Sequence, residues 1–130
     1  MSITTHIDET LGLRTHTASG ELTFTHLREV LEDVYSDPEL VQRMNVLWDL
    51  RDATPRITAE EVNKLAEFVG SGWGASSKNR AAIVVSRDFG FGMARMYELL
   101  LSNKTSNSIM VFRDLDEAKT WLSDSQASAG

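Results

Sequence analysis

Three short apolar segments, separated by helical patterns, restrict the fold of this chain more than any other feature of its sequence. Residues 44–51 read Met-Asn-Val-Leu-Trp-Asp-Leu-Arg, residues 80–86 contain Ala-Ala-Ile-Val-Val, and residues 108–112 read Ser-Ile-Met-Val-Phe. Runs of this length and composition are typical of strands that are covered on both faces of a sheet. Because a helical pattern separates each run from the next, we expect parallel strands joined by right-handed crossovers.

The helix between the first two apolar segments has the clearest local signals. Residues 52–57 read as a loop after the first segment. Residues 58–61, Thr-Ala-Glu-Glu, form a capping box, in which the threonine oxygen and the second glutamate satisfy free backbone donors of the first turn. Residues 70–72, Gly-Ser-Gly, are expected to end this helix.

Three further helices follow from periodicity and capping. Thr23 or Thr25 caps the first, and Asp37-Pro38 ends it because proline disfavours helical geometry in the residue before it. A long pattern over residues 88–103 predicts the third helix. Asp114, followed three residues later by Glu117, predicts the start of the last helix.

The N-terminal region predicts a hairpin, which completes the sheet. Residues 3–9 and 13–17 alternate between the two faces of a strand, with Gly12 at the turn between them. The expected fold is therefore a single α/β domain over residues 1–123. It has a mixed five-stranded sheet that starts with the hairpin and continues with alternating helices and parallel strands. Residues 124–130 are expected to form a flexible tail.

Composition excludes several classes of function. The chain has 130 residues and a net charge of -6, which argues against non-specific binding to nucleic acid. It contains no cysteine, so disulfides, thiolate metal sites and cysteine nucleophiles are excluded. The start lacks the features of a signal peptide, and no apolar run approaches the ~18 residues of a membrane helix. We expect a cytoplasmic protein without stable membrane insertion.

Three stretches resemble the SpoIIAA-like family of small bacterial proteins, which has the STAS fold of sulfate transporters and anti-sigma-factor antagonists. They are Val-Leu-Trp-Asp-Leu-Arg-Asp-Ala at residues 46–53, Phe-Gly-Met-Ala-Arg-Met-Tyr at residues 91–97, and Val-Phe-Arg-Asp-Leu-Asp-Glu-Ala-x-x-Trp-Leu at residues 111–122. The resemblance implies the STAS-like fold and a relation to the lipid-binding Sec14-type core. It implies little about chemistry, because this family is largely uncharacterised.

Anti-sigma-factor antagonists carry a phosphorylatable serine at the start of the helix after the central strand. The resemblance places Thr58 near this position, but the motif Asp-Ser-Ser-Gly-Leu is absent from residues 56–60. Glu60 and Glu61 would also repel an added phosphate. Thr58 is therefore interpreted as a helix cap, with a phosphorylation site as the alternative.

The same dipeptide, Arg-Asp, follows each of the three apolar segments. Its arginines are Arg51, Arg87 and Arg113, and Arg95 lies in the first turns of the third helix. Because the carboxyl ends of parallel strands meet at one edge of a sheet, these side chains predict a rim that binds an anionic ligand, completed by helix N-termini. In the alternative interpretation the aspartates cap helices or shape a loop, and the arginines are solvated or paired with them.

Large flexible and aromatic side chains predict an apolar lining beside this rim. Trp48 in the first apolar segment, with Phe91, Met93 and Met96 in the third helix, is the candidate wall of a pocket for an amphipathic, lipid-like ligand. Core filling is the alternative role of these residues. Gly92 is expected to let its helix approach the sheet closely.

The residues favour a binding role over catalysis. His6, His16 and His26 are the only histidines, and the first two lack a third ligand for zinc, so neither a metal nor another cofactor is expected. No serine lies in a nucleophile elbow, so a non-enzymatic function is favoured. The first hypothesis is a regulatory module that acts through a protein partner or as a homo-oligomer. The alternative is a carrier or sensor of a small anionic or amphipathic ligand.

Overall fold

The computed structural model describes residues 2–34, 36–37, 44–73, 80–86, 88–102 and 108–129. Within these residues the strands are β1 (Ser2–Asp8), β2 (Leu13–Thr23), β3 (Asn45–Arg56), β4 (Arg80–Val84) and β5 (Ser108–Phe112). The helices are α1 (Phe24–Val34), α3 (Ala59–Trp73), α4 (Asp88–Ser102) and α5 (Leu115–Ala129). This order of elements confirms the predicted α/β alternation.

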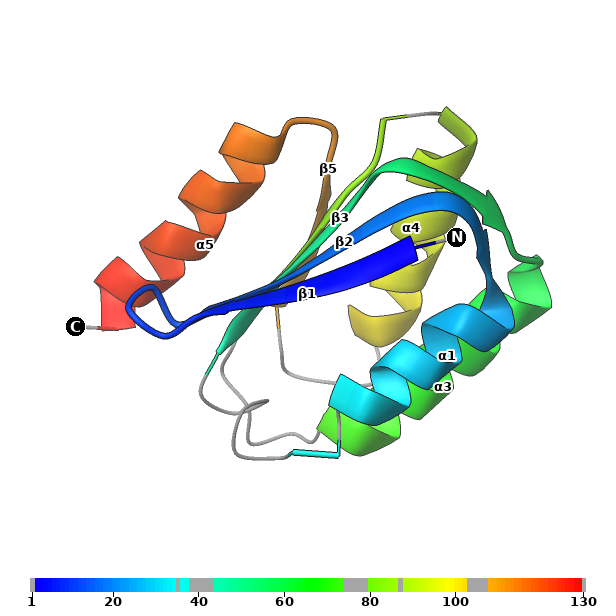
Figure 1. The fold of residues 1–130 in the computed structure, drawn as a ribbon, viewed down its shortest axis with the longest axis horizontal. Coiled ribbons are helices and arrows are strands. Elements are labelled where there is room, and N and C mark those ends of the chain that lie inside the picture. Colours follow the sequence, from blue (N-terminus) through cyan, green and yellow to red (C-terminus); the bar gives the residue numbers. More distant parts are fainter. Residues whose placement is uncertain are drawn as a thin grey trace.

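The strands form one mixed sheet in the order β1-β2-β3-β4-β5 (Figure 1). β1 and β2 pair antiparallel, and each later pair of neighbours is parallel. At the turn between β1 and β2, Gly12 has a φ of 62°, in the left-handed region that glycine adopts without a steric penalty. The predicted hairpin and the predicted parallel strands are both confirmed.

Helices α1, α3 and α4 cover one face of the sheet, and α5 covers the other (Figure 1). Leu31 of α1, Leu65 of α3 and Leu101 of α4 belong to one buried cluster. Leu47 of β3 packs with Leu122 of α5 in a separate cluster. The first three parallel crossovers each step one strand along the sheet in the same direction. Right-handed connections of this kind place all their helices on the same face.

Strand β3 is longer than predicted. The sequence predicted a loop over residues 52–57, but β3 continues to Arg56 and pairs with β2 as far as Thr23. Its pairing with β4 is limited to residues 46–49, so beyond this point β3 has a neighbour on one side only. Pro55 is tolerated there because a strand with one free edge does not need every backbone donor.

Several helix ends also differ from their predictions. The glycines at positions 70 and 72 do not end α3, which continues to Trp73. The backbone of residues 124–129 is helical, although the sequence predicted a tail without pattern, and the flexibility of these residues stays a prediction. At the start of α5 the predicted cap is confirmed, because Asp114 Oδ1 accepts hydrogen bonds from the backbone N–H groups of Asp116 at 2.7 Å and Glu117 at 3.1 Å.

The first helix starts at the earlier of its two predicted caps. Thr23 Oγ1 accepts a hydrogen bond from the backbone N–H of His26 at 3.3 Å. The helix ends at Val34, three residues before Asp37. Pro38 itself, the connector at residues 74–79 and Arg87 lie outside the described residues.

A buried amide joins α5 to the sheet. Asn45, at the start of β3, is 4% exposed. Its side-chain Nδ2 donates to the carbonyl oxygen of Leu122 at 3.2 Å, and its Oδ1 accepts from the backbone N–H of Arg80 at 2.8 Å. Arg80 Nη1 adds a hydrogen bond to the carbonyl oxygen of Trp121 at 3.0 Å. Polar contacts therefore hold the middle of α5 against the amino ends of β3 and β4.

Candidate functional site

A cavity of about 90 Å³ lies between the sheet and the helices α1, α3 and α4. Successive side chains of a strand point to opposite faces, so Trp48 and Leu50 of β3 both face these helices. Ile83 and Val85 from β4 and its continuation complete the sheet wall. The cavity lies toward the carboxyl ends of these strands, the edge at which the strand order predicted a binding site.

The helices supply the opposite wall of this cavity. Helical spacing places Leu27 and Leu31 of α1, Leu65 of α3, and Met93 and Tyr97 of α4 on its lining. The lining atoms are almost all apolar. A single water needs ~10–15 Å³ and at least two polar partners, so this cavity is too large and too apolar to be explained as a water site.

Two glycines of α4 have different surroundings. A Cβ added at Gly90 would meet Pro55 Cγ at 3.6 Å and Val85 Cβ at 3.8 Å, and Gly90 lies on the cavity lining. A Cβ at Gly92 would meet nothing within 4 Å, and Gly92 is exposed. The expectation that Gly92 allows a close approach to the sheet is therefore wrong. Gly90 has that position, because it faces Pro55 on the extension of β3.

The structure places only part of the predicted apolar lining on the cavity. Trp48 and Met93 lie on the cavity, whereas Phe91 and Met96 are not among its lining residues. Phe91 is partly buried, and the guanidinium carbon of Arg113 lies 4.4 Å from the centroid of its ring. Helical rotation explains the difference, because residues 90, 93, 94 and 97 share one side of α4 while Phe91 and Met96 point away from it.

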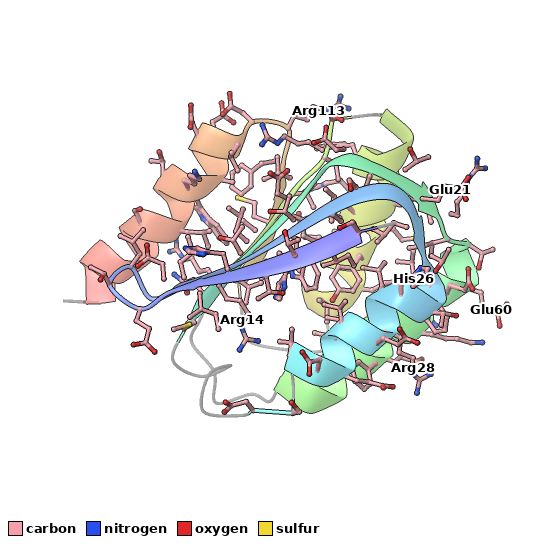
Figure 2. All side chains as sticks on the ribbon, in the orientation of Figure 1. Arg14, Glu21, His26, Arg28, Glu60 and Arg113 are labelled. Carbon is pink, nitrogen blue, oxygen red and sulfur yellow. The ribbon has the colours of Figure 1, made fainter. Side chains whose placement is uncertain are left out.

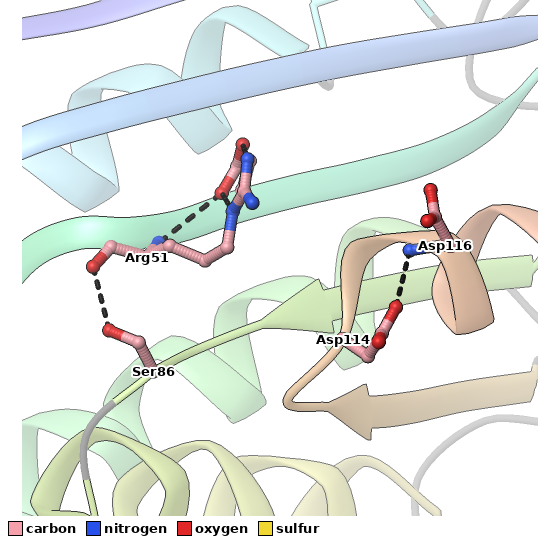
Figure 3. Close-up of polar contacts among 5 residues, drawn as sticks. Arg51, Ser86, Asp114 and Asp116 are labelled. Atoms are coloured by element: carbon pink, nitrogen blue, oxygen red, sulfur yellow. Dashed lines mark hydrogen bonds and ion pairs between the residues drawn. The ribbon is translucent and has the colours of Figure 1, made fainter.

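Arg51 lies within β3, not at its end, and its charge is balanced locally. Its Nε and Nη2 both donate to the Asp49 carboxylate at 2.9 Å, and the Ser86 hydroxyl donates to its carbonyl oxygen at 2.8 Å (Figure 3). This paired guanidinium lowers the pKa of Asp49, and the carboxylate in turn raises the pKa of Arg51. Because Asp49 and Arg51 alternate with Trp48 and Leu50, they lie on the α5 side of the sheet.

Arg95 of α4 and Arg113, which follows β5, lie on the opposite face of the sheet from Arg51. Arg95 Nη1 donates to Glu98 Oε1 at 2.7 Å. Glu98 Oε2 also accepts from the backbone N–H of Val111 at 3.0 Å, so this carboxylate covers a donor on β5, the last strand of the sheet. Arg113 stacks on Phe91 of α4, across the sheet from Arg51. The structure thus places Arg51 on one face and Arg95 and Arg113 with the helices of the other face, while Arg87 lies outside the described residues.

Thr58 has the predicted capping geometry. Its Oγ1 accepts a hydrogen bond from the backbone N–H of Glu61 at 3.1 Å, and Glu61 Oε1 accepts from the backbone N–H of Thr58 at 2.9 Å. One reciprocal pair therefore satisfies two of the free backbone donors at the start of α3. A phosphate on Thr58 Oγ1 would have to displace Glu61, which also lies 3.3 Å from this oxygen.

Replacement of Thr58 by alanine is expected to lower the free energy of unfolding by about 1 kcal/mol, because the cap oxygen of α3 is lost. The substitution Thr58→Ser keeps this oxygen and should change stability by less than about 0.5 kcal/mol. Urea unfolding of the three proteins measures both values. Equal midpoints for wild type and Thr58→Ala would show that the capping box adds nothing to stability.

Two buried polar residues on β2 were not predicted as a binding site. Arg14 is 6% exposed and was not singled out by the sequence, and His16, which the sequence suggested only as a weak zinc-ligand candidate, is 1% exposed. The His16 ring stacks on Trp48 with centroids 4.3 Å apart. Their period of two was visible in the sequence, and it could have placed both side chains on one face. That this face is covered by helices depends on the tertiary structure.

The described residues lack two kinds of feature that would change the functional interpretation. They contain no group of three or more His, Asp or Glu side chains that could hold a metal ion. None of their helices has the length and apolar content required to cross a membrane.

Comparison with solved structures identifies the architecture. An uncharacterized protein of the DUF3478 family from Shewanella loihica PV-4, described as having a SpoIIAA-like fold, matches with a TM-score of 0.58. The match covers 93% of this chain and 92% of that chain. This chain has a SpoIIAA-like fold. The two sequences share 18% identity, so the SpoIIAA-like likeness is one of architecture. No protein-family model and no curated protein matches the sequence.

Proposed function

We propose that this SpoIIAA-like protein is a non-enzymatic binding module that carries a small apolar or amphipathic ligand. The observation that supports the proposal is the cavity of about 90 Å³ between the sheet and α1, α3 and α4. Ligand sites in proteins are typically concave and mostly apolar, and dry apolar cavities take up apolar molecules. The relation to the lipid-binding Sec14-type core, which the sequence suggested, is part of the same proposal.

Packing energetics explain why such a cavity would bind a ligand. Protein interiors are close-packed, and side chains that face a gap lack some of the dispersion contacts that a filled site provides. A ligand that fills the space restores the dispersion contacts of Trp48, Met93 and their neighbours. Part of that energy then becomes binding energy.

The glycines of α4 provide a matched test of this proposal. Gly90→Leu adds a side chain on the cavity lining, whereas Gly92→Leu adds the same side chain in open space. Replacement of glycine by leucine favours the helix by about 1 kcal/mol in both variants. A difference in ligand affinity between them is therefore due to the cavity. We expect octanol to bind wild type and Gly92→Leu with equal affinity, and to bind Gly90→Leu at least about tenfold more weakly.

Calorimetric titration and the fluorescence of Trp48, which lies on the lining, measure this binding. Trp73 and Trp121 also fluoresce, so Trp48→Phe identifies the part of the signal that comes from the cavity. Absence of saturable binding to wild type, or equal affinity in the two leucine variants, would contradict the proposal.

Action through a protein partner or by self-association stays a prediction from the sequence. Among the residues that the structure describes, the exposed large apolar side chains are Ile7 at 42%, Leu11 at 52%, Leu99 at 57% and Met110 at 42%. Ile7 and Leu11 belong to the hairpin at one edge of the sheet, and Leu99 and Met110 lie at the β5 edge. Because the pairs are on opposite edges, they do not form one continuous apolar face, and ligand binding is the better-supported function.

A further inference from the structure

Arg14 is a buried cation without a counter-charge among the described residues. Its side chain is 6% exposed, and its Nε is buried and makes no hydrogen bond. The residues directly opposite Arg14 in the sheet are Ile7 of β1 and Val46 of β3, and both are apolar. Side chains directly opposite one another lie on the same face of a sheet, so the two cross-strand partners of Arg14 offer it no acceptor. Figure 2 shows Arg14 on the side of the sheet where α1 lies.

Helix α1, one of the three helices that cover this face, does not neutralise Arg14 either. Its carboxylates are Glu29, Glu32 and Asp33, and all three are exposed. Glu32 is bound to Arg28 at 3.0 Å. The side chains that α1 buries are Leu31 and Val34. A guanidinium is almost always paired when it is buried, because removal from water is costly without an anionic partner.

His16 presents a second buried polar atom on the same face. It lies two residues after Arg14 in β2, so both side chains point to the same side of the sheet. Its Nδ1 lies 2.9 Å from Thr5 Oγ1, and its ring stacks on Trp48. The remaining ring nitrogen, Nε2, is buried and has no hydrogen-bond partner. When the Thr5 hydroxyl donates to Nδ1, Nε2 carries the proton and is a free donor.

We propose that Arg14 and His16 form a binding site for an oxyanion, a carboxylate or a phosphate, next to the apolar cavity. Arg14 supplies the positive charge and an N–H donor, and His16 Nε2 supplies a second donor. Trp48 lies between the two regions, because its ring stacks on His16 and its side chain also lines the cavity. The ligand that satisfies both regions is an amphipathic acid. This part of the inference rests on the proposed function.

The protonation state of His16 agrees with this assignment. Burial and the nearby Arg14 charge lower the pKa of His16 to about 4, so the ring is neutral near pH 7. A neutral imidazole donates one hydrogen bond and adds no second buried charge. The site therefore carries a single positive charge, which matches one carboxylate.

The test compares octanoate, octanol and inorganic phosphate on the full chain near neutral pH. Octanoate and octanol have the same apolar chain, so the difference between them reports the oxyanion site. We expect octanoate to bind wild type at least about tenfold more tightly than octanol, as for a hydrogen-bonded charge pair. In Arg14→Met this preference should disappear, while octanol affinity stays unchanged. Arg28→Met removes an exposed arginine of α1 and should keep the wild-type preference.

Each ligand tests one part of the proposal, so failure of the oxyanion site can be distinguished from failure of the cavity function. Octanol reports the cavity alone, and phosphate reports the oxyanion site alone. Stabilisation of wild type but not of Arg14→Met by phosphate would show that a free anion suffices. A preference for octanoate without a phosphate effect would assign the site to the head group of an amphipathic ligand. If octanol binds but Arg14→Met responds to octanoate and phosphate as wild type does, the oxyanion site is refuted and the cavity function stands.

The variant itself is expected to fold. Replacement of an unpaired buried charge by an apolar side chain of similar length is commonly neutral or stabilising. Arg14→Met should therefore have a melting temperature equal to or above that of ligand-free wild type. A large decrease in melting temperature, together with an unchanged response to both anions, would mean that Arg14 has a structural role and would overturn the proposal.

Discussion

Acidification from pH 7 to pH 4 is expected to remove about 3 kcal/mol of unfolding free energy through His16 alone. The folded protein lowers the pKa of this side chain from 6.5 to about 4, first by burial and second by the charge of Arg14. Between these two values the unfolded chain binds a proton that the folded protein does not bind. Stability is therefore complete above pH 6.5 and falls as the pH approaches the folded pKa.

Two measurements check this result. The imidazole resonances of His16, followed by NMR against pH, should titrate with a midpoint about 4 in the folded protein. Urea unfolding at a series of pH values should show a steeper loss of stability in wild type than in His16→Phe, which keeps a ring on Trp48 but cannot titrate. The carboxylate of Asp49, whose pKa is also lowered, contributes equally to both proteins. Parallel stability curves for the two proteins would contradict the prediction.

The substitution Asn45→Leu is expected to destabilise the protein by about 3 kcal/mol. Leucine has nearly the shape of asparagine, but it removes both hydrogen bonds that Asn45 makes, to the carbonyl oxygen of Leu122 and to the backbone N–H of Arg80. The backbone N–H of Arg80 then loses its partner at a buried position, which costs about 1–3 kcal/mol. The carbonyl oxygen of Leu122, which lies within α5, loses its second hydrogen bond, which costs about 1 kcal/mol more.

Asn63→Leu is the matched control, because Asn63 lies on α3 and is only partly buried. It should change the unfolding free energy by less than about 0.5 kcal/mol. Denaturant unfolding of the two variants provides the comparison. A loss below about 1 kcal/mol in Asn45→Leu would show that solvent or a small shift of α5 satisfies the two backbone groups.

Local periodicity was sufficient to predict most of the fold. The three apolar segments became β3, β4 and β5, and the capping residues Thr58 and Asp114 start α3 and α5. These signals depend only on residues close together in the sequence, so they can be recognised without knowing the rest of the fold. Strand β3 was predicted too short because its last residues are polar and contain Pro55. Pairing with β2 on one edge nevertheless keeps them extended.

The candidate site was predicted less well, because it depends on which surfaces meet. Alternation and helical spacing identified Trp48 and Met93, which line the cavity, but also suggested Phe91 and Met96, which do not. The arginines after the apolar segments were expected to share one rim. Arg51 lies on the face of the sheet that α5 covers and Arg113 lies against Phe91 of α4, because alternate positions along a strand point to opposite faces. Anion binding by these arginines stays a prediction.

The sequence by itself determined the type and order of the elements, because the apolar periods that distinguish strands from helices depend on residues close together in the sequence. It also determined the capping residues of α3 and α5, Thr58 and Asp114, for the same reason. Only the tertiary structure decided that α1, α3 and α4 share one face and leave a cavity beneath them. Only the tertiary structure decided that Arg14 and His16 are buried, because the burial of a side chain depends on which elements cover it in the folded chain.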